Sequence, residues 1–365
     1  MYLKSLRLIN FKNWAQLELG FHDKLNCLVG FNGSGKTNVL DAIHYLSVCK
    51  SYFNPVDVQN IKDDEGFFVV EGDFFKEESP YHIYCGVKKG QKKIFRKNKK
   101  DYKKLAEHIG QFPSVVISPY DRDLITEGSD VRRKFMDAVI SQSDPLYLDH
   151  LIRYNKTLQQ RNALLKFFAA NHRFDADNLA IYNNQMAEHA PYIFEKRKEF
   201  GEMLSTKMEY YYDLIAPQQE QTEVNYISQM SGETLPDLLE KNLGKDRVNQ
   251  YTGVGIHKDD LDFMINERGL KKFGSQGQQK SFLIALKLAQ YDFLAEKQGV
   301  KPLLLLDDIF DKLDEQRVEQ LVKLVHDESF GQIFITDTHA GRTEDLIRKI
   351  SESYNLFQVR DGEII

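Results

Sequence analysis

Cysteine and tryptophan are scarce in this chain of 365 residues, and long apolar runs are missing from it. Cys27, Cys49 and Cys85 are scattered without the spacing of metal ligands, which argues against a disulfide-stapled fold and is typical of a reducing cytosol. Short apolar runs such as Leu303 to Leu306 fall well below the roughly 18 residues of a membrane span. The first residues lack the apolar stretch and the cleavage site of a signal peptide. We therefore expect a cytoplasmic protein without a membrane partner.

The composition is that of a soluble globular chain, because 42% of the residues are hydrophobic and 28% are charged. At about 150 residues per domain, the length predicts two domains, or one domain with an insertion. Residues 129–231 hold a single glycine, and their apolar side chains recur at helical spacing. We expect helices there that break near the three prolines of the segment, Pro145, Pro191 and Pro217.

The segments on either side of this helical block have the texture of mixed strands and helices. We therefore predict one α/β domain built from residues 1–125 and 250–365, interrupted by a helical insertion at residues 126–249. No internal repeat, low-complexity linker or long heptad array is evident in the sequence.

Positive charge is concentrated in one short window of an otherwise acidic chain. The net charge is −5, but residues 88–104 hold ten Lys or Arg and one Asp. Gly90 and Asn98 favour turns, so we predict a hairpin of short strands. Such a patch suits neutralisation of DNA phosphates, although a solvated hairpin is an equally good interpretation of the charge run alone. The candidate DNA contacts are Lys88, Lys89, Lys92, Lys93, Arg96 and Lys97.

A phosphate-binding loop is the strongest signal in the chain. A buried strand is predicted at 25–29, and a helix with apolar Val39, Leu40, Ile43 and Leu46 follows the loop. Glycines allow backbone N–H groups to surround phosphates at the positive end of that helix. A dinucleotide fold is excluded, because its third glycine is absent. The candidate ligands of the nucleotide match the pattern G-x-x-x-x-G-K-[ST]: Gly30, Phe31, Asn32, Gly33, Ser34, Gly35, Lys36 and Thr37.

A second strand, predicted at 301–306, ends in the carboxylates Asp307 and Asp308. A P-loop fold needs an acid at this place to hold Mg²⁺. We expect Thr37 and Asp307 to hold the metal, Lys36 to reach the β and γ phosphates, and Asp308 to polarise the attacking water.

A third motif lies 32 residues before Asp307, where Ser275-Gln-Gly277-Gln278 opens an amphipathic helix. A hydroxyl and a bare backbone at a helix N-terminus can bind phosphate. The loop at 30–37 already provides one complete phosphate site. We therefore assign Ser275, Gly277 and Gln278 to nucleotide bound by the opposite subunit, and count Ser275 as catalytic. A plain N-cap is the alternative interpretation.

Several other residues are weaker candidates. Lys12 is either a nucleotide contact or a solvated lysine, and Trp14, the single tryptophan, is more often core than an adenine platform. Asp314 is a candidate for positioning the opposite subunit, and Asp337 or His339 for sensing the γ phosphate.

The order of these motifs resembles the ABC-type ATPases of the SMC and Rad50 kind, and nearly the whole chain resembles the RecF family. The residues that carry the resemblance are Leu8–Trp14, Gly30–Ile43, Lys50–Tyr52, Ser118–Asp123, Arg132–Asp137, Gly255–Leu261, Ser275–Ser281 and Leu306–Asp314. Asp308 stands where transporter ATPases have Glu, and Gln276 where they have Gly. For the glutamine-loop role the resemblance offers only a positional guess, Tyr120 or Asp121.

The resemblance implies an ATPase head, lobe I, with a helical lobe II in place of long coiled coils. It further implies a homodimer that forms on ATP binding, binds DNA at single strands, duplexes or gap junctions, and dissociates after slow hydrolysis. A weak DNA-stimulated ATPase is expected, without nuclease or helicase activity. Partners implied in the same way are RecR and RecO, which together with it place RecA at gaps and support the SOS response. The roles of His257, Asp259 and Asp260 stay open, and we favour internal ion pairs over DNA contacts for Arg132 and Arg133.

Three other classes compete with this interpretation. A transporter ATPase subunit leaves the basic hairpin and the helical block without a role. A Rad50-like nuclease regulator needs hundreds of heptad residues that an insertion of this size does not hold. A P-loop kinase has no use for the motif at Ser275.

Overall fold

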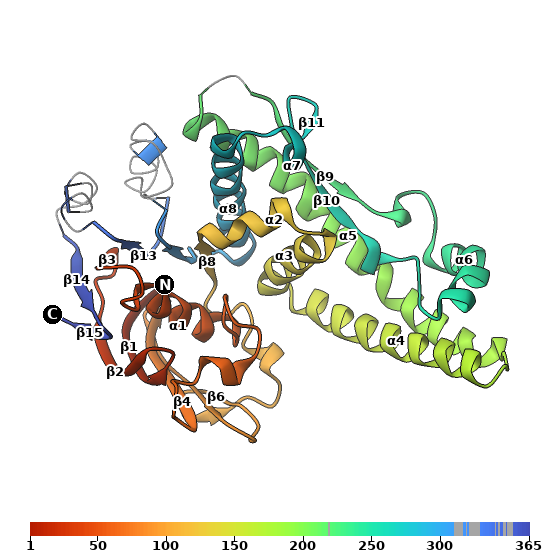
Figure 1. Ribbon diagram of the computed structural model, residues 1–365, viewed down its shortest axis with the longest axis horizontal. Helices are drawn as coiled ribbons and strands as arrows, with labels where there is room; N and C mark the ends of the chain where they lie inside the picture. Colours follow the sequence, from red (N-terminus) through yellow and green to blue (C-terminus); the bar gives the residue numbers. More distant parts are fainter. Residues whose placement is uncertain are drawn as a thin grey trace. The chain divides into compact units, whose positions relative to one another are not determined.

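The computed structural model describes residues 1–217, 220–309, 317–318, 320, 329–339, 341, 344–345, 348 and 353–365, and Figure 1 shows the ribbon. The chain divides into two compact units. The first consists of Met1–Arg122, Tyr210–Gln219 and Ser275–Ile365, and the second of Asp123–Glu209 and Glu220–Gly274.

The first unit is built on two sheets. An antiparallel sheet has the strand order β2-β1-β4-β5-β6-β7. Its strands are β1 (Tyr2–Phe11), β2 (Trp14–Gly20), β4 (Phe67–Lys76), β5 (Ser79–Lys88), β6 (Ile94–Lys97) and β7 (Lys100–Asp101). In the second sheet the order is β15-β14-β3-β13-β12-β8, parallel except for the β14–β15 pair. Its strands are β3 (Leu25–Val29), β8 (Ser114–Ile117), β12 (Leu303–Leu306), β13 (Ile333–Asp337), β14 (Asn355–Arg360) and β15 (Glu363–Ile364).

Helix α1 (Lys36–Val48) lies between the two sheets, as Figure 1 shows, and contacts β1 and β4 of one and β8 and β13 of the other. Its apolar Val39, Leu40, Ile43 and Leu46 are buried, as the helical pattern predicted. Every residue of β3, β12 and β13 is buried. Central parallel strands that are covered on both faces have continuous apolar sequences, which is why these strands were recognisable in the sequence.

The second long helix of the first unit is α8 (Gln276–Gln298), which packs against β8 and against the short helix η3 (Pro119–Arg122). Two further single-turn helices, η1 (Asp57–Asn60) and η2 (Leu105–Glu107), belong to the connections around the antiparallel sheet. No helix in the described ranges is long and apolar enough to cross a membrane.

The second unit is mainly helical. Its helices are α2 (Asp123–Thr126), α3 (Ser129–Ser143), α4 (Pro145–Ala170), α5 (Ala176–Ile215, whose end from Tyr210 belongs to the first unit), α6 (Leu235–Asn249), α7 (Leu270–Phe273), η4 (Gln229–Ser231) and η5 (Ile256–Lys258). A small antiparallel sheet in the order β11-β10-β9 accompanies them. Its strands are β9 (Thr222–Ile227), β10 (Asp260–Ile265) and β11 (Arg268–Gly269).

Three expectations about the helical block need correction. Pro191 does not break a helix but lies inside α5. An interior proline costs about 3 kcal/mol, and the burial of Met186, Ala190 and Ile193 around it offsets that cost. The block also contains a strand, β9, which pairs with β10 beyond residue 249. The second compact unit consequently extends to Gly274.

Candidate nucleotide-binding site

The predicted phosphate loop connects β3 to α1 in the first unit. Gly35 adopts a φ of 115°, which L side chains rarely adopt. At Gly30, an added Cβ atom would come within 2.1 Å of the carbonyl oxygen of Val359. The two glycines are therefore required by backbone conformation and by close approach of β14.

Lys36 is buried, and its ammonium group donates to the carbonyl oxygens of Gly30 and Phe31 at 2.8 and 3.1 Å. Ser34 Oγ is also buried and has no hydrogen-bond partner within the described residues. An unsatisfied buried hydroxyl costs about 1–3 kcal/mol, a cost that a phosphate oxygen would remove. The loop residues therefore fit a phosphate group.

Three hydroxyl groups converge on Asp307 where β12 ends. Oδ1 accepts hydrogen bonds from Thr37 Oγ1 at 2.7 Å and Thr336 Oγ1 at 2.9 Å, and Oδ2 accepts one from Ser118 Oγ at 3.2 Å. Burial raises the pKa of Asp307, and the three hydroxyl donors oppose that shift. Oxygen ligands of this kind are those that Mg²⁺ prefers, so the donor set fits the metal. Sequence reasoning missed Ser118 and Thr336, because only the strand order brings them to Asp307.

Asp308 follows directly and is half-buried. Its backbone φ is 46°, an uncommon conformation for a residue other than glycine, and its N–H donates to Thr336 Oγ1 at 2.9 Å. Thr336 thus bonds the carboxylate of Asp307 and the backbone of Asp308.

Ser275 is the N-cap of α8 and forms a complete capping box with Gln278. Ser275 Oγ accepts from the Gln278 N–H at 3.2 Å, and the Ser275 N–H donates to Gln278 Oε1 at 2.6 Å. An added Cβ at Gly277 would lie 3.0 Å from Arg317 Nη1. Within the subunit, Ser275 therefore has the capping role that the sequence left open as an alternative.

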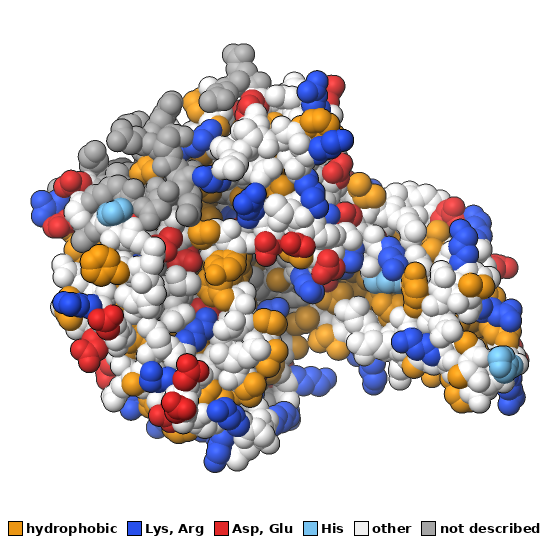
Figure 2. Space-filling view, in the orientation of Figure 1, with side chains coloured by type: hydrophobic (Ala, Val, Ile, Leu, Met, Phe, Trp, Pro, Cys, Tyr) orange, Lys and Arg blue, Asp and Glu red, His pale blue; other side chains and the backbone are white. Residues whose placement is uncertain are grey.

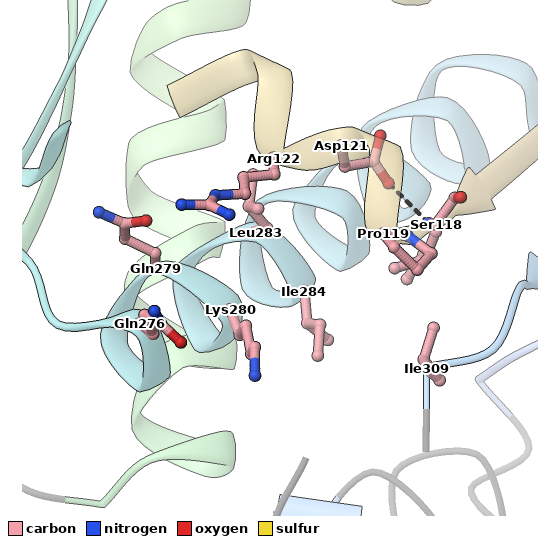
Figure 3. A pocket seen from close by; sticks show the side chains of 11 residues that line it. Ser118, Pro119, Asp121, Arg122, Gln276, Gln279, Lys280, Leu283, Ile284 and Ile309 are labelled. Atoms are coloured by element: carbon pink, nitrogen blue, oxygen red, sulfur yellow. Dashed lines mark hydrogen bonds between the residues drawn. The ribbon is translucent and has the colours of Figure 1, made fainter. Parts of the chain in front are cut away.

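A pocket of about 350 Å³ joins this helix start to the end of β8, as Figure 3 shows. Ser118 and Pro119 line it on one side and Gln276, Lys280 and Ile284 on the other. In the close-up, Ile309, which follows Asp308 in the chain, lies at the end away from Gln276, and a dashed line marks the Ser118–Asp121 hydrogen bond. The motif at Ser275 and the strand-end carboxylates are thus neighbours in the fold.

Of the two residues guessed for the glutamine-loop role, Tyr120 is 65% exposed and Asp121 is buried. Asp121 accepts from the Ser118 N–H at 2.8 Å and pairs with Lys287 at 3.4 Å. The side chain that reaches Asp307 from this segment is Ser118.

The weaker candidates have clear places. Lys12 pairs with the buried Asp41 at 2.6 Å, so it is not a solvated lysine, and Trp14 is fully buried. Asp337 accepts from the N–H of Thr338 at 2.7 Å, and His339 is exposed. Asp314, with the stretch 310–316, lies outside the described residues.

The predicted basic hairpin is present as β6 and β7, with Asn98 and Lys99 in the turn at positive φ. Lys88, Lys89 and Lys92 are exposed. Lys89 nevertheless donates to the Glu65 carbonyl oxygen at 2.7 Å. The remaining three candidates also have intramolecular partners: Lys93 pairs with Asp57 at 2.8 Å, Arg96 with Asp101 at 2.6 Å, and Lys97 donates to Gln111 Oε1 at 2.6 Å. In Figure 2, Lys and Arg side chains project at the tip where Figure 1 places β6, with acidic side chains beside them.

The unassigned motif at 255–261 belongs to a buried ion-pair network of the second unit. Arg132 makes a two-pronged bond to Asp260 at 2.7 and 2.9 Å, and Arg133 donates to the Asp259 carbonyl at 2.7 Å. Arg197 pairs with Asp259 at 2.8 Å. The preference for an internal ion pair is confirmed for Arg132, whereas Arg133 bonds a backbone carbonyl of the same unit. No group of three or more His, Cys, Asp or Glu that could hold a metal ion occurs among the described residues.

The fold and the loop define the class of the protein. Residues 2–364 match the RecF/RecN/SMC N terminal domain family, to which the chain belongs. A protein of Flavobacterium johnsoniae named DNA replication and repair protein RecF is 54% identical over 98% of this chain and 100% of its own length. A protein of Phocaeicola vulgatus with the same name is 48% identical over 100% and 98%. The solved structure of the recombination mediator protein RecF-ATP in RecFOR pathway matches with a TM-score of 0.89 at 32% identity, covering 100% of this chain and 97% of the other. Within the class, the chain is thus a member of the RecF family of DNA replication and repair proteins, as its motifs indicated.

Proposed function

We propose that the protein is an ATP-dependent DNA-binding protein of replication and recombinational repair. The observation that carries the proposal is the hydrogen bond of 2.7 Å between Thr37 of the phosphate loop and Asp307 at the end of β12. These two groups flank the place where a nucleotide and its metal are held in P-loop proteins. A solved relative that is 32% identical, with 97% of its chain covered, is described as RecF-ATP.

The phosphate loop would hold ATP through its N–H groups, and Lys36 would exchange its bonds to Gly30 and Phe31 for bonds to the phosphates. Thr37 and Asp307 would hold Mg²⁺, which supplies neutralisation of the phosphate charge. Asp308 orients the water that converts ATP to ADP and phosphate. Because its carboxylate is one methylene shorter than that of Glu, we expect weak hydrolysis. Stimulation of this hydrolysis by DNA is an expectation from the family resemblance.

Ser275, Gly277 and Gln278 would contact the nucleotide of a second subunit, so that ATP joins two heads into a homodimer on DNA. Hydrolysis then releases the dimer. With RecO and RecR, such a dimer would support the placement of RecA at gaps and the SOS response in the cytoplasm. In this proposal the first compact unit is lobe I, and the mainly helical second unit is lobe II.

The basic hairpin is the proposed DNA contact, with Lys88, Lys89 and Lys92 as its exposed members. Lysines on a hairpin neutralise phosphates without reading sequence, which suits a protein that binds duplex, single strand or gap junction.

Sedimentation of the protein with ATP and Mg²⁺, with ADP, and without nucleotide tests the dimer, each with and without gapped duplex. Lys36→Met removes nucleotide binding. Ser275→Asp and Ser275→Asn are a matched pair, because both residues cap helices well and only Asp brings negative charge to the phosphates. We expect an ATP-driven dimer that binds DNA, and ATP-bound monomers of Ser275→Asp.

A wild-type protein that binds ATP yet stays monomeric and ignores DNA would contradict the proposal and favour an ordinary P-loop phosphotransferase. If Ser275→Asp and Ser275→Asn lose the dimer equally, the size of the new side chain is responsible, and not repulsion between its charge and the phosphates.

A further inference from the structure

Two carbonyl oxygens of the phosphate loop are held from outside the loop. Ser34 O accepts from Asn13 Nδ2 at 3.0 Å and from the Gly362 N–H at 3.2 Å. Gly35 O accepts from Trp14 Nε1 at 3.1 Å and, as the N-cap of α1, from the Asn38 and Val39 N–H groups at 3.1 and 3.3 Å. The outside donors come from the β1–β2 turn and the β14–β15 turn, at opposite ends of the chain.

The β1–β2 turn contacts α1 as well as the loop. Asn13 Oδ1 accepts from Asn38 Nδ2 at 2.7 Å, and Lys12 pairs with Asp41 at 2.6 Å. Three consecutive residues, Lys12 to Trp14, therefore hold the loop and the first turns of the helix that follows it. Trp14 is fully buried, which fixes its indole N–H in place.

The consequence for the loop follows from peptide geometry. In a planar trans peptide the C=O and N–H groups point in opposite directions. The outside donors hold Ser34 O, and Trp14 reinforces the direction that the first bonds of α1 give to Gly35 O. The N–H groups of Gly35 and Lys36 are therefore turned to the other side of the loop. That side is the start of α1, where N–H groups and the helix dipole favour phosphate.

We propose that Asn13 and Trp14 are positioning residues that aim the N–H groups of Gly35 and Lys36 at the nucleotide phosphates. The inference rests on the proposed function, since it assumes that the loop binds a nucleotide. It gives the β1–β2 turn a role beyond core packing, because Asn13 and Trp14 each donate a side-chain hydrogen bond to the loop backbone.

The glycine at position 35 supports this assignment. A Cβ atom there would lie 2.5 Å from Asn13 Nδ2 and 2.9 Å from Trp14 Nε1. The turn is therefore pressed against the loop, and no side chain at position 35 could be accommodated without displacing both donors.

The test compares Asn13→Ala and Trp14→Phe with Leu17→Ala. Trp14→Phe keeps a buried ring and removes only the N–H donor, whereas Leu17 is a buried residue of β2, in the same hairpin. Affinities for ADP, inorganic pyrophosphate and adenosine are measured by displacement of a fluorescent ADP analogue, at a temperature where all variants are folded.

We expect Asn13→Ala and Trp14→Phe each to weaken ADP and pyrophosphate about fivefold to tenfold, the equivalent of one net hydrogen bond. Adenosine should compete equally in all variants, because the positioned N–H groups face phosphates. Leu17→Ala should bind all three as the wild type does. Wild-type affinity for pyrophosphate in both turn variants would overturn the inference, and so would an equal loss in Leu17→Ala.

Trp14 also provides a reporter, since it is the single tryptophan of the chain. Its emission should change when ADP or pyrophosphate binds the wild type and Asn13→Ala, but stay constant in Lys36→Met. A wild type that binds no nucleotide in the displacement assay would refute the proposed function itself. If Lys36→Met abolishes nucleotide binding but Asn13→Ala and Trp14→Phe leave it intact, only the inference is refuted.

Discussion

Thr37 Oγ1 and Asp307 Oδ1 lie 2.7 Å apart although 270 residues separate them in the chain. Thr37 follows β3 and Asp307 follows β12, and both strands are neighbours of β13 in a parallel sheet. The carboxyl ends of parallel strands meet at one edge, so the loop after β3 and the carboxylate after β12 come together there.

This relationship predicts a metal-specific defect. Asp307→Asn should leave nucleotide affinity in EDTA within about twofold, and should remove most of the gain in affinity that Mg²⁺ gives to wild type, because an amide is a poorer ligand than a carboxylate. Titration of a fluorescent ATP analogue with and without Mg²⁺ measures both. An Asp307→Asn variant with the full Mg²⁺ effect would exclude this residue from the metal site.

Ser118 should have a weaker effect of the same kind. Its hydroxyl donates to Asp307 Oδ2 at 3.2 Å, so Ser118→Ala frees the carboxylate to turn. We expect the affinity for Mn²⁺, measured by paramagnetic resonance on the ADP complex, to fall about threefold to tenfold, as for one hydrogen bond to a charged group. Ser118→Thr keeps the hydroxyl and should retain most of the affinity. If Ser118→Ala binds Mn²⁺ as wild type does, the hydroxyl has no part in the site.

The hairpin lysines should separate into DNA contacts and structural residues. Reversing charge in Lys88→Glu/Lys92→Glu should weaken duplex binding and reduce the slope of log K against log salt by about 2, because each phosphate contact contributes about 1. The matched variant Lys93→Met/Lys97→Met should instead lower thermal stability, since these ammonium groups bond Asp57 and Gln111. Anisotropy titrations at several salt concentrations and thermal melts distinguish the two. An unchanged slope in the first variant would place the DNA contact elsewhere.

Arg197 should be critical for the stability of the second unit. Its guanidinium is 2% exposed and pairs with Asp137 and Asp259, both at 2.8 Å. Arg197→Met leaves Asp259 buried without its cation, which costs about 3–5 kcal/mol of the free energy of unfolding. Arg153→Met, at an exposed pair with Asp149, should cost less than about 0.5 kcal/mol. Urea unfolding followed by circular dichroism tests the contrast, and similar midpoints for the two variants would contradict it.

Acid should destabilise the second unit through His257. Its Nε2 lies 3.0 Å from the Thr252 carbonyl oxygen, which can only accept a hydrogen bond, so Nε2 carries the proton of the neutral ring. Nδ1 then accepts from the Tyr154 hydroxyl at 3.0 Å. Burial lowers the pKa of His257 to about 4 from 6.5. The unfolded chain therefore binds more protons between these values, and the stability present above pH 6.5 is lost as pH falls towards 4.

His257→Gln should reduce the loss of stability between pH 7.5 and pH 5 by about 1–2 kcal/mol, and the exposed His172→Gln should not change it. Urea unfolding at the two pH values measures the difference. Identical pH dependence in wild type and His257→Gln would show that this imidazole does not carry the effect.

Local sequence was sufficient for the elements that carry the site. Glycine spacing at 30–35 marks a loop whose backbone needs unusual φ angles, and Ser275 with Gln278 marks a helix start; both depend on residues a few positions apart. The uninterrupted apolar runs of β3 and β12 indicated buried parallel strands. Pro191 inside α5 was not predictable in this way, because packing of distant side chains overrides the local preference.

The sequence by itself thus determined the phosphate loop, the carboxylates after β12 and the cap of α8, since each is a local pattern with a local physical cause. Tertiary structure alone decided that Ser118 and Thr336 join Thr37 at Asp307, and that Asn13 and Trp14 hold the loop from behind. Those contacts depend on the strand order β3-β13-β12-β8 and on the β1–β2 turn reaching the loop. Parallel strands buried on both faces are all apolar and much alike, so their sequences do not specify which strand lies next to which.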